Sequence, residues 1–373
     1  MYDPALRTPE ALLDAYHTLT EWSAAIANTG ATVAVVQRFG AEARVERDGV
    51  AYQFTADREP PWLSTTTAPA SFVRAVAGFS PDIVHVNGLI FPAVVAAIRK
   101  ELGPRVTIVA QHHGGEFPIR GSGIFGAFNR MKWRSGLASA DALSFTAAEQ
   151  AEPWRAAGML TAQRILEIVE ASTALRHVSR ERGSAALGLS GRPLILWVGR
   201  LTTNKDPLTV LDGLEHALPR LPDAHVVMMF GDDTLVEPVD ARVRSSSILQ
   251  GRVTLAGRVP REELPNYYAA ADVFVSGSHS EGSGYALIEA MAVGVVPVVT
   301  DIPSFRVIAG EQGARWPAED AAAFTNALLQ VCENDFGAAR ARVKAHFDGV
   351  LSWAAIATRT VTEYRSLAKA KRI

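Results

Sequence analysis

The amino-acid sequence predicts an α/β protein with two doubly wound, Rossmann-like domains, and three observations support this prediction. Short apolar runs alternate with helical patterns through both halves of the 373-residue chain, as in parallel sheets covered by helices. The length suits two or three domains, and a 48% share of hydrophobic residues is enough for large buried cores. The alternation stops over residues 170–193 and then restarts sharply, so we expect a linker within this stretch.

The first half begins with a helical pattern over residues 9–28, where a threonine and a proline suit the N-cap and the first helical position. Buried strands are expected at 31–37, 82–86, 106–110 and 142–146, with helices near 91–101 and 125–137. In a parallel sheet of this kind, ligands bind beyond the carboxyl ends of the strands. Asn87, His112 and His113 stand at such ends.

The second half repeats the alternation and predicts a second parallel sheet. Strands are expected at 194–198, 225–230, 253–256, 273–276 and 295–300, with helices at 207–217, 262–270 and 284–293. We therefore expect a first domain over 1–175, a linker over 176–193 and a second domain over 194–350. The last stretch, 351–373, is helical but too polar to be a core element, and we expect it to pack back on the first domain.

Net charge and cysteine content indicate which binding partners and which cellular compartment to expect. The formal net charge is −2, so the sequence does not indicate nucleic-acid binding, and any membrane contact is expected to be peripheral at most. The basic and aromatic residues mixed over 125–137 are more typical of an ordinary packed helix than of a membrane-facing one. The single cysteine, Cys332, excludes an internal disulfide framework. With no signal peptide and no long apolar run, we expect a cytoplasmic protein.

The stretch 276–301 carries the strongest chemical signal. Gly282 and Gly284 open a helix, and the free amides and positive dipole of a helix N-terminus suit an anion such as phosphate. A plain turn with strain-relieving glycines is the alternative. Two acids favour a functional site: Glu281 stands just before the helix, and Glu289 lies on its otherwise apolar face. An acid in apolar surroundings needs a partner, and a buried arginine is the structural alternative for Glu289.

The loop after strand 194–198 is the second candidate. Gly199 is followed by Arg200 and Lys205, whose cations could bind phosphate oxygens or could simply be exposed loop charges. The adjacent acids Asp232 and Asp233 follow another strand, but two neighbouring acids without a third ligand rarely chelate a metal. We therefore predict no metal site.

Taken in order, these motifs resemble those of the retaining glycosyltransferases of family 4, which have the GT-B fold. The motifs are Gly199-Arg200-Leu201 with Lys205, Leu255-Ala256-Gly257-Arg258-Val259, Ala271-Asp272-Val273, Glu281-Gly-x-Gly with Glu289-Ala-Met, and Pro297-Val-Val. Glu281 and Glu289 are spaced like that family's paired glutamates. The resemblance covers nearly all of residues 194–360 and is thinner in the first half. It implies two Rossmann-like domains that face each other across a cleft, with the first domain on the acceptor side.

The resemblance also implies a role for each charged position. Arg200 and Lys205 would neutralise the diphosphate of a nucleotide-sugar donor. Glu281 would hydrogen-bond hydroxyls of the donor sugar, and Glu289 would bind the two ribose hydroxyls. His113 would face the sugar from the other domain, with His112 as the alternative because only one of two consecutive strand residues can point into the cleft.

Backbone groups complete the implied site. The amides of Gly282, Ser283, Gly284 and Tyr285 would hold the phosphates, and the Arg258-Val259 loop would lie beside the base. Where Ser283 and Tyr285 stand, the family often has phenylalanine and an aliphatic residue, so the donor sugar is hard to infer. The family also has a strand and a glycine-rich loop before helix 9–28, so we expect a rebuilt first domain or a start site chosen too late.

The implied reaction is the transfer of a sugar from a nucleotide-diphosphate sugar, with UDP or GDP expected, to the hydroxyl of a saccharide, lipid or small molecule. Neither a metal nor another cofactor is expected, because fixed cations and helix amides would stabilise the leaving diphosphate. Two alternatives stay open. One is a catalytically inactive relative that binds nucleotide sugar, and the other is a GT-B sugar-nucleotide epimerase.

Overall fold

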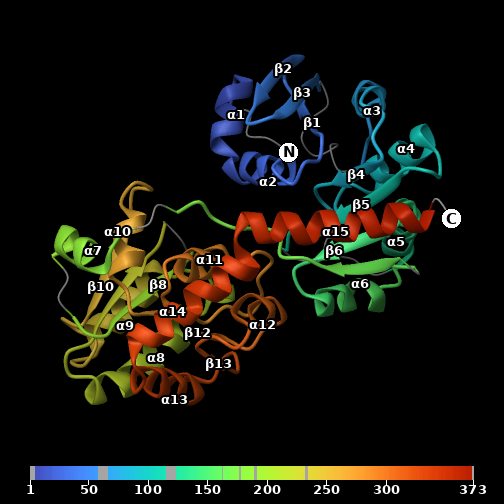
Figure 1. The fold of residues 1–373 in the computed structure, drawn as a ribbon. Helices are drawn as coiled ribbons and strands as arrows, with labels where there is room; N and C mark the ends of the chain where they lie inside the picture. The colour runs from blue at the N-terminus through green and yellow to red at the C-terminus, as the bar shows by residue number, and fades with distance from the viewer. Residues whose placement is uncertain are drawn as a thin grey trace. The chain divides into compact units, whose positions relative to one another are not determined.

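The computed structural model describes residues 5–57, 66–114, 123–161, 163–175, 178–188, 191–231 and 234–371. The chain divides into two compact units, and Figure 1 labels most of their helices and strands. Unit 1 comprises Met1–Ala171 together with Trp353–Ile373, and unit 2 comprises Ser172–Ser352. Among the described residues, no helix is both long and apolar enough to cross a membrane.

Unit 1 distributes its strands between two sheets. The first has the order β1-β3-β2, with β1 (Val33–Phe39), β2 (Ala43–Arg47) and β3 (Val50–Ala56). The second is fully parallel, with the order β4 (Ile83–Val86), β5 (Thr107–Gln111), β6 (Ala142–Phe145) and β7 (Arg164–Glu167). The sequence predicted β1 and β4 to β6, whereas the antiparallel β2–β3 hairpin was not foreseen.

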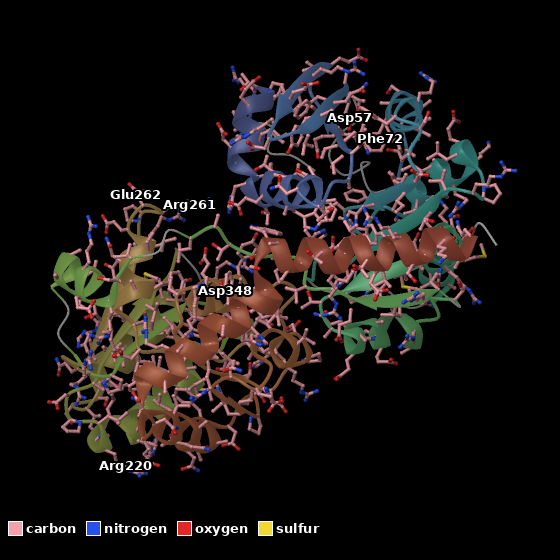
Figure 2. All side chains as sticks on the ribbon, in the orientation of Figure 1. Asp57, Phe72, Arg220, Arg261, Glu262 and Asp348 are labelled. Atoms are coloured by element: carbon pink, nitrogen blue, oxygen red, sulfur yellow. The ribbon has the colours of Figure 1, made fainter. Side chains whose placement is uncertain are left out.

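Among the described residues of unit 1, side-chain contacts and not strand pairing join the two sheets. Val36 of β1 packs against the core of the four-stranded sheet, as does Phe72 of the helix α3 (Ala70–Gly78). Asp57, labelled with Phe72 in Figure 2, follows β3 and pairs with Arg38 of β1 at 2.5 Å. Unit 1 also contains the helices α4 (Pro92–Leu102), α5 (Gly123–Leu137) and α6 (Glu152–Ala156).

The helix predicted over residues 9–28 is two helices, α1 (Pro9–Ala15) and α2 (His17–Ala27). The break is at Tyr16, where ψ is 55° and the backbone leaves the helical region. Because of this break, α1 and α2 pack into different hydrophobic cores. Leu12 and Leu13 are buried with the three-stranded sheet, whereas Ile26 packs with Ala357 and Val361 of the last helix.

That last helix, α15 (Trp353–Lys371), belongs to unit 1. Its Trp353 donates an indole hydrogen bond of 2.8 Å to Glu21 of α2, and the Tyr364 hydroxyl lies 2.5 Å from Nδ1 of His85 on β4. Burial beneath Tyr364 and Trp22 lowers the pKa of His85 to about 3, so this ring is neutral at ordinary pH. The C-terminal helix is thus fixed to unit 1 by both apolar and polar contacts.

Unit 2 is built on one six-stranded parallel sheet with the order β10-β9-β8-β11-β12-β13. Its strands are β8 (Leu194–Val198), β9 (His225–Met229), β10 (Val253–Gly257), β11 (Val273–Ser276), β12 (Val296–Thr300) and β13 (Ala314–Trp316). Its helices are α7 (Arg180–Leu187), α8 (Pro207–Ala217), α9 (Val236–Ser245), α10 (Leu264–Ala270), α11 (Tyr285–Ala292), α12 (Pro303–Ala309), α13 (Ala321–Cys332) and α14 (Phe336–His346). The strand order reverses between β8 and β11, and in doubly wound sheets ligands bind at such a switch point.

Helix α7 lies inside the stretch predicted to be a linker, 176–193. The Arg180 guanidinium makes two hydrogen bonds, of 2.8 and 2.9 Å, to the buried Asp272 carboxylate. Gly183 lies against α10, where an added Cβ would meet the Asn266 carbonyl oxygen at 2.6 Å. The stretch is therefore partly a packed element of unit 2. Its helix has almost no apolar periodicity, which explains why the sequence did not reveal it.

Candidate active site

The candidate site lies where the two middle strands of the unit 2 sheet end. β8 and β11 are neighbours, so the loops that follow them meet at the carboxyl edge. A Cβ on Gly277 would lie 2.8 Å from the backbone oxygen of Asp206, so the approach of the two loops requires glycine. The His279 amide donates to the Asn204 carbonyl at 2.8 Å, and the Asn204 side chain donates to the Ser280 carbonyl at 3.0 Å. The two predicted loops thus form one structure.

The structure brings Lys205 and Glu281 together. Lys205 Nζ forms an ion pair with Glu281 Oε1, and the Ser278 hydroxyl donates to the same oxygen at 2.7 Å. The Ser278 side chain is itself fixed, because it is fully buried and lies 3.0 Å from the Ser276 hydroxyl. Thr300 of β12 also donates to the Ser278 carbonyl at 2.5 Å. The cation and the acid are therefore held in place by the ends of three strands.

Two arginines border the same edge. Arg200 follows β8, directly after Gly199, and Arg258 follows β10 with Val259. Both side chains are exposed, and within the described part of the chain neither has an ion-pair partner. Figure 2 labels Arg261 and Glu262, which mark the loop that carries Arg258 from β10 to α10. The edge thus offers two exposed guanidinium groups, the type of donor that binds phosphate oxygens in pairs.

Glu289 lies on α11, and its carboxylate accepts a 2.8 Å hydrogen bond from Tyr268 of α10. Burial raises the pKa of Tyr268 well above its usual value, and the nearby Glu289 carboxylate raises it further. The tyrosine therefore stays protonated and donates. One oxygen of Glu289 is thus oriented by a residue that has no exposed surface.

Gly284 opens α11 in the left-handed region, with φ of 59°. A side chain there would be strained, and its Cβ would approach Ile308 Cδ1 to 2.9 Å. Since glycine offers no capping side chain, the amides of Tyr285 and the next residues depend on other acceptors. Gly282, Ser283, Gly284 and Tyr285 therefore lie at a helix N-terminus of the kind that binds phosphate.

The two consecutive histidines of unit 1 differ in their surroundings. The His112 ring stacks on Phe145 with 5.0 Å between centroids, and its Nδ1 accepts from the Gly114 amide at 3.2 Å. Burial lowers the pKa of His112 to about 4, so its ring is neutral and serves as packing. His113 is 40% exposed and contacts the side chains of Asn87 and Glu170. Of the two, His113 has the more exposed side chain.

Sequence reasoning missed three polar partners in these sites. Tyr268 resembles any core aromatic residue, Ser278 any loop serine, and Glu170 follows a strand without a recognisable motif. Asp232 and Asp233 lie outside the described residues. Across the described part of the chain, histidine, cysteine and acidic residues form no group of three that could hold a metal ion.

Two family models match the chain. The model described as "Glycosyl transferase 4-like domain" matches residues 17–168, and the model described as "Glycosyl transferases group 1" matches residues 192–334. The first match covers most of unit 1 and the second most of unit 2. Both halves of the chain are therefore recognised as glycosyltransferase domains.

Individual proteins agree with the family models. The chain is 28% identical over 293 residues to GDP-mannose:cellobiosyl-diphosphopolyprenol alpha-mannosyltransferase from Xanthomonas oryzae pv. oryzae, a match that covers 76% of this chain and 74% of that protein. It is 36% identical over 136 residues to mannosylfructose-phosphate synthase from Agrobacterium fabrum, across 35% of this chain and 29% of that protein. The solved structure of sucrose-phosphate synthase from Thermosynechococcus elongatus superposes with a TM-score of 0.67 at 22% identity, over 94% of this chain and 93% of that one.

These matches agree with the two α/β units and with the polar edge of the unit 2 sheet. The chain belongs to the group 1 glycosyltransferases of family 4, and it is a glycosyltransferase of the GT-B fold that uses a nucleotide-sugar donor.

Proposed function

We propose that this chain transfers a sugar from a UDP- or GDP-linked donor to an acceptor hydroxyl, with retention of anomeric configuration and without a metal ion. The observation that carries the proposal is the Lys205–Glu281 pair, which the ends of β8, β11 and β12 hold beside the N-terminus of α11. A cation and an acid in contact suit a substrate that joins a diphosphate to a sugar. In this proposal Lys205 turns to the phosphate and Glu281 to the sugar hydroxyls.

The chemistry is charge stabilisation at the leaving group. Breaking the bond between the anomeric carbon and the diphosphate places negative charge on phosphate oxygens, and donors fixed in advance stabilise that charge. Lys205, Arg200 and the amides at Gly284 are the groups that would do so here. The acceptor hydroxyl would attack from the face that the diphosphate leaves, and a phosphate oxygen would accept its proton.

Glu289 and the Arg258 loop would bind the nucleoside. The Glu289 carboxylate, which accepts a hydrogen bond from Tyr268, would also accept hydrogen bonds from the two ribose hydroxyls. Arg258 and Val259 would lie beside the base. This division predicts that nucleotide affinity depends on Glu289, whereas transfer depends on Glu281.

The relatives suggest which substrates to test first. The Xanthomonas relative is named for GDP-mannose as donor and for a cellobiosyl-diphosphopolyprenol acceptor. We propose GDP-mannose as the first donor and a saccharide carried on a diphosphate lipid as the first acceptor class. A free saccharide or another small hydroxyl compound is the second acceptor class.

The first test is a thermal-shift screen of this chain against GDP, UDP, ADP and their sugar conjugates. A ligand that binds the folded state raises the melting temperature, so a shift with GDP or UDP would identify the base. Transfer is then followed by mass spectrometry with and without EDTA. Loss of transfer with EDTA would contradict the metal-free mechanism, and inversion at the anomeric carbon would contradict retention.

Binding without transfer to any acceptor of either class would favour the inactive-relative alternative. A donor that is epimerised in the absence of acceptor would favour the epimerase alternative. No shift with any nucleotide would contradict the proposal for the unit 2 site.

A further inference from the structure

A second polar bridge joins the two loops that carry Lys205 and Glu281. Nε2 of His279, in the loop after β11, forms a 3.1 Å hydrogen bond with Oδ2 of Asp206, the residue that follows Lys205. Because an ionised carboxylate only accepts hydrogen bonds, the ring is the donor. The other oxygen of Asp206 accepts a 3.3 Å hydrogen bond from the Thr209 amide at the start of α8. One carboxylate thus joins the loop after β11 to the N-terminus of α8.

Asp206 makes these contacts from an unfavourable backbone conformation. Its φ is 42° and its ψ is 58°, in the left-handed region, which glycine would adopt without strain. Aspartate tolerates that region better than most residues do, but strained residues persist only where the surrounding structure holds them, and they gather at functional sites. The Asp206 side chain is also only 14% exposed. The strain therefore points to a use for this carboxylate.

The other nitrogen of the His279 ring faces a second acid. Nδ1 lies 3.9 Å from Oε1 of Glu319, which follows β13. The Glu319 side chain is 76% exposed, and an ion pair at that exposure contributes little to stability. The bond to the mostly buried Asp206 is the stronger of the two contacts. His279 is therefore joined firmly to the loop of Lys205 and only weakly to that of Glu319.

The two bridges differ in what donor binding would do to them. In the proposed function Lys205 turns to the phosphate and Glu281 to the sugar, so their ion pair opens. The bond between His279 and Asp206 takes no part in that exchange. Together with Asn204, whose side chain bonds to the same loop, it is left to hold the two loops together. Lys205 lies between these two residues in sequence, so both of its neighbours stay fixed.

We propose that His279 is a positioning residue, which binds Asp206 and so keeps Lys205 in place for the donor diphosphate when the Lys205–Glu281 pair opens. The inference rests on the proposed function, in which Lys205 binds that diphosphate. His279 acts through Lys205 and contacts no part of the donor. Its removal should therefore weaken nucleotide binding only as long as Lys205 is present.

A double-mutant cycle on nucleotide affinity tests this coupling. Calorimetric titration of the full chain with GDP and UDP gives the Kd of the wild type, His279→Leu, Lys205→Ala and the double variant. His279→Leu should raise the Kd for the preferred nucleotide by about 2- to 13-fold, because binding must then order the Lys205 side chain. In the Lys205→Ala background the same substitution should change the Kd little, since residues that act through one another are not additive. An equal fold-change in both backgrounds would overturn the proposal.

Rescue and control variants separate positioning from general destabilisation. Glutamine offers an N–H donor at a reach similar to that of Nε2, so His279→Gln should restore most of the affinity. His216→Leu removes an exposed histidine of α8 and should leave the Kd unchanged. Should His279→Leu fail to fold, Asp206→Gly takes its place in the cycle, because glycine suits the left-handed backbone and is tolerated as an N-cap. A His279→Gln variant that binds as weakly as His279→Leu would count against the assigned role.

Hydrogen–deuterium exchange of the free protein keeps this inference distinct from the proposed function. The His279 amide bonds to the Asn204 carbonyl, so exchange over residues 277–281 reports whether the two loops stay together. Exchange there should be faster in His279→Leu than in the wild type, and unchanged in His216→Leu. Unchanged exchange in His279→Leu would overturn the proposal even if nucleotides bind. If the wild type bound neither GDP nor UDP, the proposed function would fail, and faster exchange in His279→Leu would still support the bridge.

Discussion

The Tyr268 hydroxyl donates a 2.8 Å hydrogen bond to the Glu289 carboxylate from a position with no exposed surface. The bond joins α10 to α11 and orients an acid on a short helix whose other side is apolar. Removing the hydroxyl leaves the carboxylate in place but takes away this orienting hydrogen bond. We therefore expect Tyr268 to set the affinity for the nucleoside through Glu289.

Tyr268→Phe should weaken nucleotide binding without abolishing it. Binding must then order the Glu289 side chain, which costs about 0.5–1.5 kcal/mol, so the Kd for the preferred nucleotide should rise by about 2- to 13-fold. Glu289→Ala should weaken it at least as much. Calorimetric titration measures both, and Tyr267→Phe on the same helix is the matched control. Equal affinities of the wild type and the Glu289→Ala variant would remove the role assigned to Glu289.

Substitutions of Lys205 and Glu281 should have different effects on transfer and on nucleotide binding, although the two side chains are in contact. Glu281→Ala should abolish transfer and leave nucleotide binding nearly intact, because it removes a group proposed to contact only the sugar. Lys205→Ala should lower transfer by about 100- to 1000-fold, as expected when one donor to a developing negative charge is lost.

Steady-state kinetics and nucleotide titration of the same preparations test this pair. Lys344→Ala is the control, since that lysine forms an exposed ion pair with Asp348, labelled in Figure 2, on the following turn. A Glu281→Ala variant that still transfers sugar at the wild-type rate would exclude the acid from the reaction.

The parts of the site that the sequence predicted are those with a local signal. Glycines beside acids marked the turn before α11, and a basic loop after an apolar run marked Arg200 and Lys205. In the sheet of unit 2, β8 and β11 are neighbours, a relationship that no local pattern contains. The contact between Lys205 and Glu281 follows from that strand order. Both residues were therefore predicted from the sequence as site residues, but the contact between them was not.

Other elements were missed for identifiable reasons. The β2–β3 hairpin turns at Asp48-Gly49, both with positive φ, and Asp-Gly between apolar-alternating segments is a hairpin signal that could have been recognised. Tyr268 and Glu170 carry no such signal, because their partners come from other elements. Their roles depend on tertiary packing, which overrides local preference.

Asp272 should be a main determinant of the stability of unit 2. Its buried carboxylate accepts two hydrogen bonds from Arg180 of α7 and a third, of 2.9 Å, from the Leu194 amide that begins β8. Removing one partner of a buried pair leaves the other uncompensated, so Asp272→Ala should cost about 3–5 kcal/mol. The melting temperature should fall by roughly 6–20 °C.

Differential scanning calorimetry checks this expectation. The control is Asp240→Ala, which breaks the exposed Asp240–Arg244 pair of α9 and should change stability little. If Asp272→Ala had the same melting temperature as the wild type, the pairing of α7 with the sheet would not stabilise unit 2.

Unit 1 should lose stability as the pH falls below about 6.5. Burial lowers the pKa of His85 to about 3 and that of His112 to about 4, whereas an unfolded histidine titrates near 6.5. Below that value the unfolded chain binds protons that the folded unit excludes, so each ring removes up to about 1.4 kcal/mol per pH unit until its folded pKa is reached. The full contribution is present above pH 6.5.

Melting temperatures measured from pH 7 to pH 5 test this dependence. His112→Phe keeps an aromatic ring on Phe145 and removes one titrating group, so its melting temperature should fall less steeply with pH than that of the wild type. His216→Gln changes an exposed histidine of α8 and should follow the wild-type curve. Burial of the histidines, and not their number, therefore sets the slope of melting temperature against pH. If the melting temperature of His112→Phe fell with pH as steeply as that of the wild type, the proton bound on unfolding would be taken up by a group other than His112.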